Sequence, residues 1–303
     1  MSLGESMVTY SAPAKIYLFG EHAVVYNKHA VAVAVNLRTR VSLRRSDRFI
    51  YQTDGDTRYI EGALGIFSSL KKIPGLELRV ESDIPIGAGL GSSAAVTVAT
   101  LGALNEEFDA GLGIEEIARL AFEVERSIQG VASPTDTFVS SVGGCVLVPD
   151  LTRVTDHLRC SIVIGDTKVV GYTKKLVKDV KELRSRETEI LDLIFDTIDR
   201  IAVTGLDALS AGDYTRVGEL MNINHGLLDA MGVGTSKLSE LVYAARSGGA
   251  LGAKITGAGG GGCIVAICEE KDVGRVVDAI RGRGGGAIVV DVAREGLRRE
   301  SED

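Results

Sequence analysis

Residues Asp83–Ala95 read Asp-Ile-Pro-Ile-Gly-Ala-Gly-Leu-Gly-Ser-Ser-Ala-Ala, and the rest of the chain is organised around this stretch. Leu76–Ser82, which precedes it, alternates apolar and polar residues and predicts a half-buried strand. Ala94–Phe108, which follows, is rich in Ala, Leu and Thr without proline and predicts a buried helix. The alternate glycines between them permit positive φ angles and let a ligand approach backbone amides at the start of a helix. The stretch therefore predicts a strand, a phosphate-binding loop and a helix.

The glycine loop does not match either of the common nucleotide-binding motifs. A Walker A motif requires a Lys before its Ser or Thr, and a Rossmann loop requires a third glycine where this chain has Ser92. A tight strand-to-helix turn with Ser92 or Ser93 as the helix N-cap would explain the same residues without a ligand. The double serine favours the phosphate site, because one hydroxyl can cap the helix while the other faces a phosphate or Mg²⁺.

The composition is that of a soluble globular protein with room for two domains. Of its 303 residues, 45% are hydrophobic and 25% are charged, and 5% aromatic residues with 37 glycines favour an α/β core of small aliphatic side chains. The net charge of −7 argues against nucleic acid or an anionic membrane as a partner. The most basic segment, Arg38–Arg48, is interpreted as the solvated face of a strand.

The four cysteines and the N-terminus indicate a cytoplasmic protein. No two cysteines form a C-x-x-C pair and all lie in apolar runs, so we expect buried thiols in a reducing compartment. No basic and apolar signal sequence opens the chain, and no apolar run approaches the length of a membrane span. Met1–Ser6 is interpreted as an expression leader, with Met7 as the natural start.

Two domains, residues 1–157 and 158–303, are expected, because the polar, turn-rich segment Asp150–Arg159 separates two halves of different character. The tail Arg294–Asp303 is expected to fray. Further strands are predicted at Ala30–Val35, Thr39–Leu43, Cys145–Pro149, Ser161–Gly165, Cys263–Cys268 and Ala287–Val292, with a glycine loop at Gly252–Gly262. Further helices are predicted at Glu61–Lys72, Ile114–Ile128, Thr173–Ala208, Asp213–Ala230, Thr235–Arg246 and Lys271–Gly282.

Charged residues in apolar surroundings are the first candidates for chemistry. Lys15, Glu21 and His22 lie in one apolar segment, where a charge costs free energy unless it is paired or used. Asp136 follows a predicted N-cap at Ser133 by three residues, so it could stabilise its helix or act as a general base. Lys15 could pair with Asp136 or neutralise a transferred phosphoryl group, or it could extend to solvent from a strand edge. His22 could donate to a substrate, or it could be a core histidine.

Two further features are open to both a functional and a structural interpretation. Glu125 and a loop serine would suffice to hold Mg²⁺ on phosphates, although an exposed helical glutamate is the commoner case. Gly257–Gly262 formally satisfies G-x-G-x-x-G, but a strand and not a helix follows it. Close approach of its backbone to another loop or to a ligand is the better interpretation, with Lys254 and Thr256 flanking it.

Three stretches, in this order and spacing, resemble the three motifs of the GHMP kinases over nearly the whole chain: Pro13–Tyr26, Pro85–Ala95 and Lys254–Cys263. The sequence of the first stretch is similar to that of the mevalonate kinase family, in Lys15 and in Glu21-His-Ala-Val-Val-Tyr26. The segment Ser133-Pro-Thr-Asp136 is similar to the same family, and the compact length resembles its archaeal branch. The resemblance implies an N-terminal ribosomal-S5-like α/β domain with a left-handed crossover. It also implies a ferredoxin-like α+β C-terminal domain, an ATP cleft between the two, and a homodimer.

The resemblance also implies an ATP- and Mg²⁺-dependent phosphorylation of the 5-hydroxyl of mevalonate in isoprenoid biosynthesis. Asp136 and Lys15 would be catalytic, Ser93 and Glu125 would bind Mg²⁺, and Glu21, His22, Asp136 and Thr173 would hold mevalonate. Gly171 stands where a basic residue is usual in animal enzymes. Thr256, Gly257 and Gly259 would support the site. The residues on the ATP phosphates would be Pro85, Gly87, Ala88, Gly89, Leu90, Gly91, Ser92, Ser93 and Ala94.

Two alternatives to this activity remain open. One is another GHMP kinase of a small alcohol, such as phosphomevalonate or homoserine. The other is a non-catalytic sensor with the same fold, against which the presence of Lys15, Ser93, Glu125 and Asp136 argues. The kinase signatures H-R-D and D-F-G are absent from the sequence, so a protein kinase is excluded.

Overall fold

The structure, a computed structural model, describes residues 7–85, 87–130 and 133–301, so Met1–Ser6 lie outside the described residues. The larger sheet contains β1 (Val8–Phe19), β2 (Ala30–Arg45), β3 (Ile50–Gln52), β4 (Leu76–Ser82), β5 (Cys145–Val148), β6 (Thr152–Thr155) and β11 (Arg298–Arg299). The smaller sheet contains β7 (Ser161–Asp166), β8 (Gly252–Thr256), β9 (Cys263–Cys268) and β10 (Gly286–Val290). The α-helices are α1 (Arg58–Phe67), α2 (Ser92–Glu107), α3 (Ile114–Gln129), α4 (Thr135–Val142), α5 (Thr173–Arg186), α6 (Thr188–Ala211), α7 (Tyr214–Ala230), α8 (Ser236–Ser247) and α9 (Val273–Gly282).

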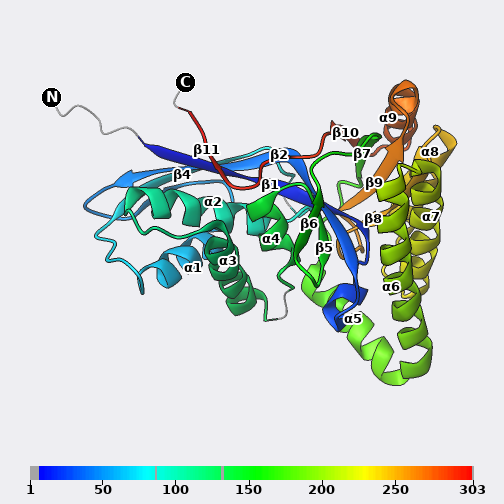
Figure 1. Cartoon of the computed structure of the whole chain (residues 1–303), viewed down its shortest axis with the longest axis horizontal. Helices are drawn as coiled ribbons and strands as arrows, with labels where there is room; N and C mark the ends of the chain where they lie inside the picture. The colour runs from blue at the N-terminus through cyan, green and yellow to red at the C-terminus, as the bar shows by residue number, and fades with distance from the viewer. Residues whose placement is uncertain (1–6, 86, 131–132, 302–303) are drawn as a thin grey trace.

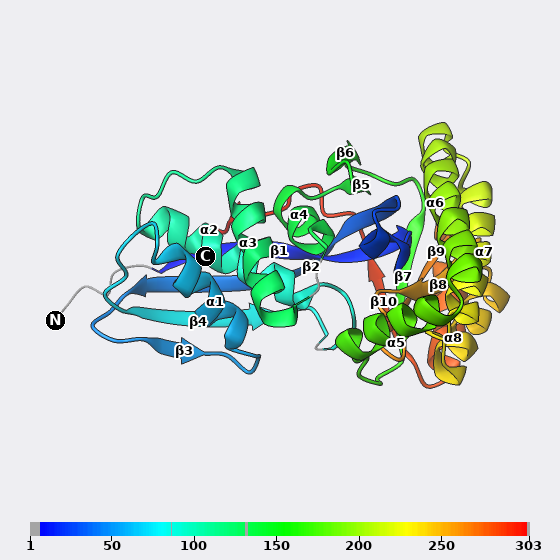
Figure 2. The ribbon, with the colours of Figure 1, turned by 90° about the horizontal axis from the view of Figure 1, so that it is seen from below.

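The larger sheet is built on the long antiparallel pair β1 and β2 (Figure 1). Its order is β11-β1-β2-β4-β3, and β5 with β6 extends it from β2. Helices α1, α2 and α3 lie together against one side of this sheet (Figure 2). Helix α2, predicted from its Ala and Leu content, is almost wholly buried because it packs against both long strands and against the helices α1, α3 and α4. The loop before α2 therefore stands between a sheet and a central buried helix.

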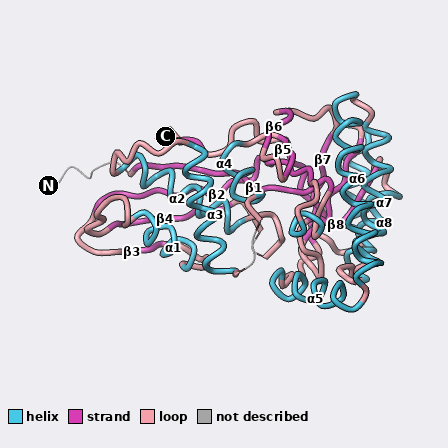
Figure 3. Tube along the Cα trace, turned by 60° about the horizontal axis from the view of Figure 1, so that its bottom comes forward, coloured by secondary structure: helices cyan, strands magenta, loops and turns pink. Residues whose placement is uncertain are grey.

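The smaller sheet has the order β10-β7-β9-β8, with every neighbouring pair antiparallel. Counted along the chain this is the strand order 4-1-3-2, which confirms the ferredoxin-like expectation. Helices α6, α7 and α8 stack beside it at the end of the molecule away from the N-terminus (Figure 3). The division of the chain between residues 157 and 158 stays a prediction.

Some predicted segments differ in the structure. Ala30–Val35 and Thr39–Leu43 are parts of one strand, β2, because its residues find partners on β1 and β4 without interruption of the strand. The first five residues of the predicted glycine loop Gly252–Gly262 form β8 instead, since they pair in register with β9. The turn-rich segment Asp150–Arg159 contains the short strand β6, which pairs with β5.

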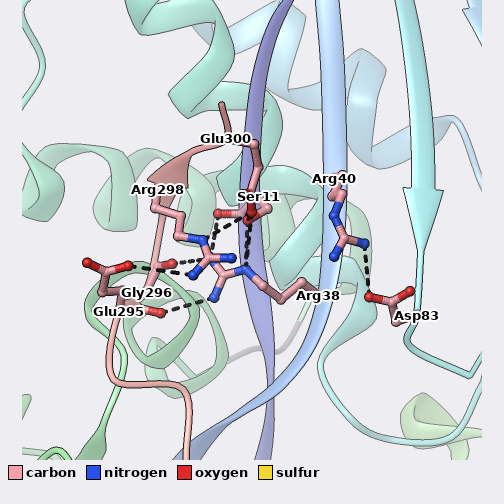
Figure 4. A network of polar contacts seen from close by, with 8 residues as sticks. All are labelled: Ser11, Arg38, Arg40, Asp83, Glu295, Gly296, Arg298 and Glu300. Atoms are coloured by element: carbon pink, nitrogen blue, oxygen red, sulfur yellow. Dashed lines mark hydrogen bonds and ion pairs between the residues drawn. The ribbon is translucent and has the colours of Figure 1, made fainter. Parts of the chain in front are cut away.

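Residues 294–301 of the C-terminal tail do not fray as expected, because a buried arginine anchors them. The last two residues of the predicted tail lie outside the described residues. Arg38 donates from Nε to the Ser11 hydroxyl at 2.6 Å and from its other nitrogens to the carbonyls of Ser11, Glu295 and Gly296 (Figure 4). Glu300 accepts from the Ser11 hydroxyl, and β11 pairs with β1. The interpretation of Arg38 as part of a solvated face was also wrong, since it is 5% exposed.

Three of the four cysteines are buried as expected, and Cys160 is partly buried. All four are free within the part of the chain that the structure describes, and Cys145, Cys263 and Cys268 are buried. Burial raises the pKa of the Cys145 and Cys160 thiols to about 12, so they are small apolar groups and not nucleophiles. Over the same residues, no helix is long and apolar enough to cross a membrane.

Candidate active site

The glycine loop between β4 and α2 has the backbone that its sequence predicts. Gly87, Gly89 and Gly91 have φ angles of +70°, +75° and +76°, a region that favours glycine. Between them, Ala88 and Leu90 are buried, and the Leu90 carbonyl accepts from the Lys15 amide at 2.9 Å. This hydrogen bond holds the loop against β1, and the glycines place no side chain over their backbone amides. Amides at the start of α2 form the kind of positive helix end that binds phosphate.

Neither serine is the N-cap of α2, so that alternative was wrong. Gly91 takes the cap position in a left-handed conformation. The Ser93 hydroxyl donates instead to Oε1 of Glu125 on α3, at 2.7 Å. Glu125 is 3% exposed, so the interpretation as an exposed helical glutamate was wrong as well. A hydroxyl and a buried carboxylate therefore meet at the first turn of α2.

The carboxyl group of Glu125 is unusually basic for a glutamate. Burial, and next the negative charge of Asp136, raise the pKa of Glu125 to about 7. A buried carboxylate whose charge is destabilised in this way gains most from a nearby cation. The oxygen donors of Ser93 and Glu125 are also the type that Mg²⁺ prefers. Among residues 7–85, 87–130 and 133–301 there is no cluster of three or more His, Cys, Asp or Glu side chains that could hold a metal.

Asp136 pairs with Lys15 across the site. Lys15 Nζ on β1 lies 3.1 Å from Asp136 Oδ1 in the first turn of α4, with exposed side-chain fractions of 3% and 28%. The predicted cap at Ser133 was wrong, because Pro134 precedes the helix and Asp136 is its second residue. The lysine, brought from a distant strand, is a stronger partner for the carboxylate than the local amides. Asp136 Oδ2 points toward Gly91, 3.7 Å from where a Cβ on that glycine would stand.

Glu21 forms a second ion pair, and this one is sealed from solvent. Its Oε1 accepts from Nζ of Lys254 on β8, and the two side chains are 1% and 0% exposed. His22, the next residue, contacts the Ala258 carbonyl through Nε2 at 2.9 Å. Burial lowers the pKa of His22 below its usual value, so the imidazole is neutral. The turn after β1 is therefore tied to the second glycine loop.

The two glycine loops lie backbone against backbone, as the sequence predicts. A Cβ on Gly257 would stand 2.8 Å from the Gly89 carbonyl, and one on Gly262 equally close to the Ala88 carbonyl. The Tyr17 amide of β1 donates to the Thr256 hydroxyl at 2.8 Å. Only residues without a Cβ permit this approach, which brings the two halves of the chain together at the site.

Thr173, the first residue of α5, is exposed and lines a small cavity with both glycine loops, including Gly87 and Gly259. Gly171 lines the same cavity, and a Cβ there would stand 2.9 Å from the Gly259 carbonyl. A longer side chain at position 171 would require the second glycine loop to move. The close approach of the second glycine loop thus favours glycine at position 171.

Two residues that the sequence interpretation gave no role also belong to this site. Lys254 was noted only as a neighbour of the glycine loop, and its partner Glu21 lies 233 positions away. Tyr17 was not singled out, yet its hydroxyl lies 3.4 Å from Asp136 Oδ1. Tyr17 follows Lys15 by two residues on a strand, so the period of a strand places both side chains on one face and could have revealed it.

Comparison with protein families gives two matches to this chain. The model described as the GHMP kinases N terminal domain matches residues 58–144. The model described as GHMP kinases C terminal matches residues 206–286. The first range contains the phosphate loop, Glu125 and Asp136, and the second contains Lys254 and the second glycine loop.

Individual relatives indicate which of the GHMP kinases this chain resembles. The mevalonate kinase of Archaeoglobus fulgidus is 42% identical, over 96% of this chain and 99% of that protein. The crystal structure of the Methanococcus jannaschii mevalonate kinase superposes with a TM-score of 0.84 at 28% identity, over 96% of this chain and 99% of that one. A mevalonate kinase of L. major in complex with R-mevalonate gives a TM-score of 0.81 at 25% identity, over 96% of both chains. The chain therefore belongs to the GHMP kinases and, within them, to the mevalonate kinase family.

Proposed function

We propose that this chain transfers the terminal phosphoryl group of ATP to the 5-hydroxyl of mevalonate, giving 5-phosphomevalonate. The observation that carries the proposal is the Lys15–Asp136 pair at 3.1 Å beside a glycine loop at the start of α2. A carboxylate, a cation and a phosphate loop are the parts that phosphoryl transfer requires. The substrate is supported by the names of the relatives, one of which was crystallised with R-mevalonate.

Asp136 is the residue that acts on the attacking hydroxyl. Its Oδ1 is held by Lys15 and its Oδ2 is directed toward Gly91 of the phosphate loop. A hydroxyl placed between Oδ2 and the loop would be oriented toward the phosphoryl group and could pass its proton to the carboxylate. Lys15 lies against the Asp136 carboxylate and places a positive charge where negative charge develops on the transferred group. Its 3% exposure keeps that charge out of water.

Pro85 and residues 87–94 would form the phosphate cradle, with the glycine backbone and the first amides of α2 facing the ATP phosphates. Ser93 and Glu125 are assigned as the ligands of Mg²⁺, because a buried carboxylate of raised pKa beside a hydroxyl fits a hard cation. When bound, Mg²⁺ would neutralise charge on the phosphates. One carboxylate and one hydroxyl leave most of its coordination positions to phosphate and water.

His22 and Thr173 are assigned to the mevalonate side of the site. His22 is neutral and fixed by the Ala258 carbonyl, and Thr173 lines the cavity between the two glycine loops. Glu21 would support the mevalonate site indirectly, since its side chain pairs with Lys254 and does not line the cavity. The supporting residues Thr256, Gly257 and Gly259 hold the second loop against the first. Gly171 leaves the mevalonate carboxylate without a basic partner at that position.

The test is ATP-coupled turnover with Mg²⁺ on mevalonate, phosphomevalonate, homoserine and galactose. Selective turnover of mevalonate is the expected result. Equal or better turnover of another alcohol would overturn the substrate assignment and keep the kinase chemistry. Binding of ATP without turnover of any alcohol would favour a ligand sensor. Repeating the assay with Mg²⁺ chelated tests the metal, and sedimentation of the purified chain tests the expected homodimer. Fractionation of the source cells tests the expected cytoplasmic location.

A further inference from the structure

The strand that carries Lys15 also carries a buried tyrosine at the same site. Tyr17 is 5% exposed and lies two residues after Lys15 on β1, so both side chains leave the same face of the strand. Across from them on β2 stand Ala32 and Ala34, whose small side chains leave room for the longer ones. Tyr17 packs in a cluster that includes these alanines and Val139 of α4. The ring is therefore wedged between β2 and the helix of Asp136.

Tyr17 contacts both members of the Lys15–Asp136 pair. Its hydroxyl lies 3.4 Å from Asp136 Oδ1, the oxygen that Lys15 also contacts at 3.1 Å. Its ring lies under the Lys15 ammonium, with 4.0 Å from Nζ to the ring centroid. A ring face attracts a cation at this distance. One side chain thus positions the carboxylate through its hydroxyl and the ammonium through its ring.

The Tyr17 hydroxyl stays protonated and can therefore act as a hydrogen-bond donor. Burial, and next the charge of Asp136, raise the pKa of Tyr17 well above its usual value, so the hydroxyl keeps its proton. The hydroxyls of Ser133 and Thr135, joined to each other at 3.0 Å, also lie beside it. Asp136 Oδ1 is thereby held from two sides, and Oδ2 remains directed toward Gly91. An oxygen held by two donors fixes the rotation of the whole carboxylate.

We propose that Tyr17 is a positioning residue for the reaction, one that holds Asp136 Oδ1 so that Oδ2 meets the substrate hydroxyl. The inference rests on the proposed function for its kinetic consequence. The structural consequence is independent of the proposed function, because the Tyr17–Asp136 contact exists without substrate. A distance of 3.4 Å is long for a hydrogen bond, and such contacts at active sites often shorten when the substrate is bound.

The test compares Tyr17→Phe with a matched control, Tyr10→Phe. Tyr17→Phe removes the hydroxyl and keeps the ring under Lys15. Tyr10, on the same strand, donates to Glu106 at the surface, so its variant removes the same atom away from the site. We expect Tyr17→Phe to lower kcat by roughly 3- to 10-fold with KM for ATP and mevalonate nearly unchanged, as for a contact used in the transition state. The control should match the parent protein.

A second measurement does not depend on turnover. The ¹³Cγ resonance of Asp136, assigned with Asp136→Asn, should move in Tyr17→Phe and stay in place in Tyr10→Phe. If the parent protein does not phosphorylate mevalonate but the resonance moves, the proposed function fails and the positioning contact stands. An unchanged kcat together with an unchanged resonance overturns the inference. So does a kcat loss accompanied by higher KM values and a lowered midpoint of thermal unfolding, which would mark a general distortion.

Discussion

Two lysine–carboxylate pairs lie at this site, and their surroundings differ. Lys15–Asp136 joins β1 to α4, and its carboxylate is 28% exposed. Lys254–Glu21 joins β8 to the turn after β1, and neither side chain is more than 1% exposed. The same two functional groups can act on a substrate in the first pair, because a ligand can reach Asp136. The second pair is closed to solvent, so we expect it to hold the protein together.

The sealed pair is also the more demanding of the two. Burial raises the pKa of Glu21 and lowers the pKa of Lys254, so each charge is destabilised by its surroundings and depends on the other. Within the described residues, Oε2 of Glu21 finds no hydrogen-bond partner, nor does Nδ2 of the nearby Asn224. A buried pair of this kind favours one arrangement over others more than it adds net stability. We therefore expect the open pair to affect the reaction rate and the sealed pair to affect the stability of the fold.

The largest expected effect is on stability, in Lys254→Met. Removal of the lysine leaves Glu21 charged and unpaired in the interior, which costs about 3–5 kcal/mol of unfolding free energy. Denaturant unfolding at neutral pH measures the loss. The control is the double variant Glu21→Gln with Lys254→Met, which removes both charges and should recover part of it. An unfolding midpoint equal to that of the parent protein would show that the sealed pair does not hold the turn.

Asp136→Asn should have the opposite signature. The amide keeps the size of the side chain but loses the charge that faces Lys15 and accepts the proton, so kcat should fall by at least about 10²-fold. ATP affinity should persist, because the phosphate loop is untouched. Steady-state kinetics, ATP binding and unfolding, measured on one preparation, separate this variant from Lys254→Met. Full activity in Asp136→Asn would defeat the assignment of Asp136 as the catalytic carboxylate.

How far the sequence could predict these two pairs depends on the range of the interaction. The alternating glycines predicted the loop, since positive φ is a local property of the residues. Charge in an apolar segment indicated Lys15 and Glu21. The partner of Glu21 could not be inferred, because no local pattern connects it with a lysine 233 positions later. A motif thus reveals which residues matter before it reveals what they contact.

The wrong expectations have the same origin. Glu125 lies at the edge of the apolar stripe of its helix, and only the packing of α2 and the nearby Asp136 decide that this edge is buried. Asp136 looked like a helix-capping acid until a lysine from β1 reached it. The C-terminal tail looked like a charged end until Arg38 bound its carbonyls. In each case a distant residue outweighed the local preference.

Glu125→Gln extends the comparison to a buried carboxyl without a lysine. The folded-state pKa of Glu125 is raised to about 7. The folded form therefore binds this proton more tightly than the unfolded chain, and its stabilising contribution is present at low pH and lost as pH rises through about 7. In Mg²⁺-free buffer, Glu125→Gln should be more stable than the parent at pH 8 by roughly 2 kcal/mol and nearly equal at pH 4. Thermal unfolding at both pH values measures this, and an equal gain at both would contradict the raised pKa.

The smallest effect is expected from Thr256→Val, which probes the surroundings of the Lys254–Glu21 pair. We call these surroundings the sealed region. Thr256 follows Lys254 by two residues on β8, so both side chains leave the same face of that strand toward β1. Its hydroxyl accepts from the buried Tyr17 amide at 2.8 Å, and valine would leave that amide unpaired at a cost of about 1–2 kcal/mol. Thr256→Ser, which keeps the hydroxyl, is the control and should stay close to the parent protein in denaturant unfolding. If Thr256→Val loses kcat far beyond its loss of stability, the sealed region also sets the position of β1 residues in the reaction. The division between a pair for rate and a pair for structure would then fail at this residue.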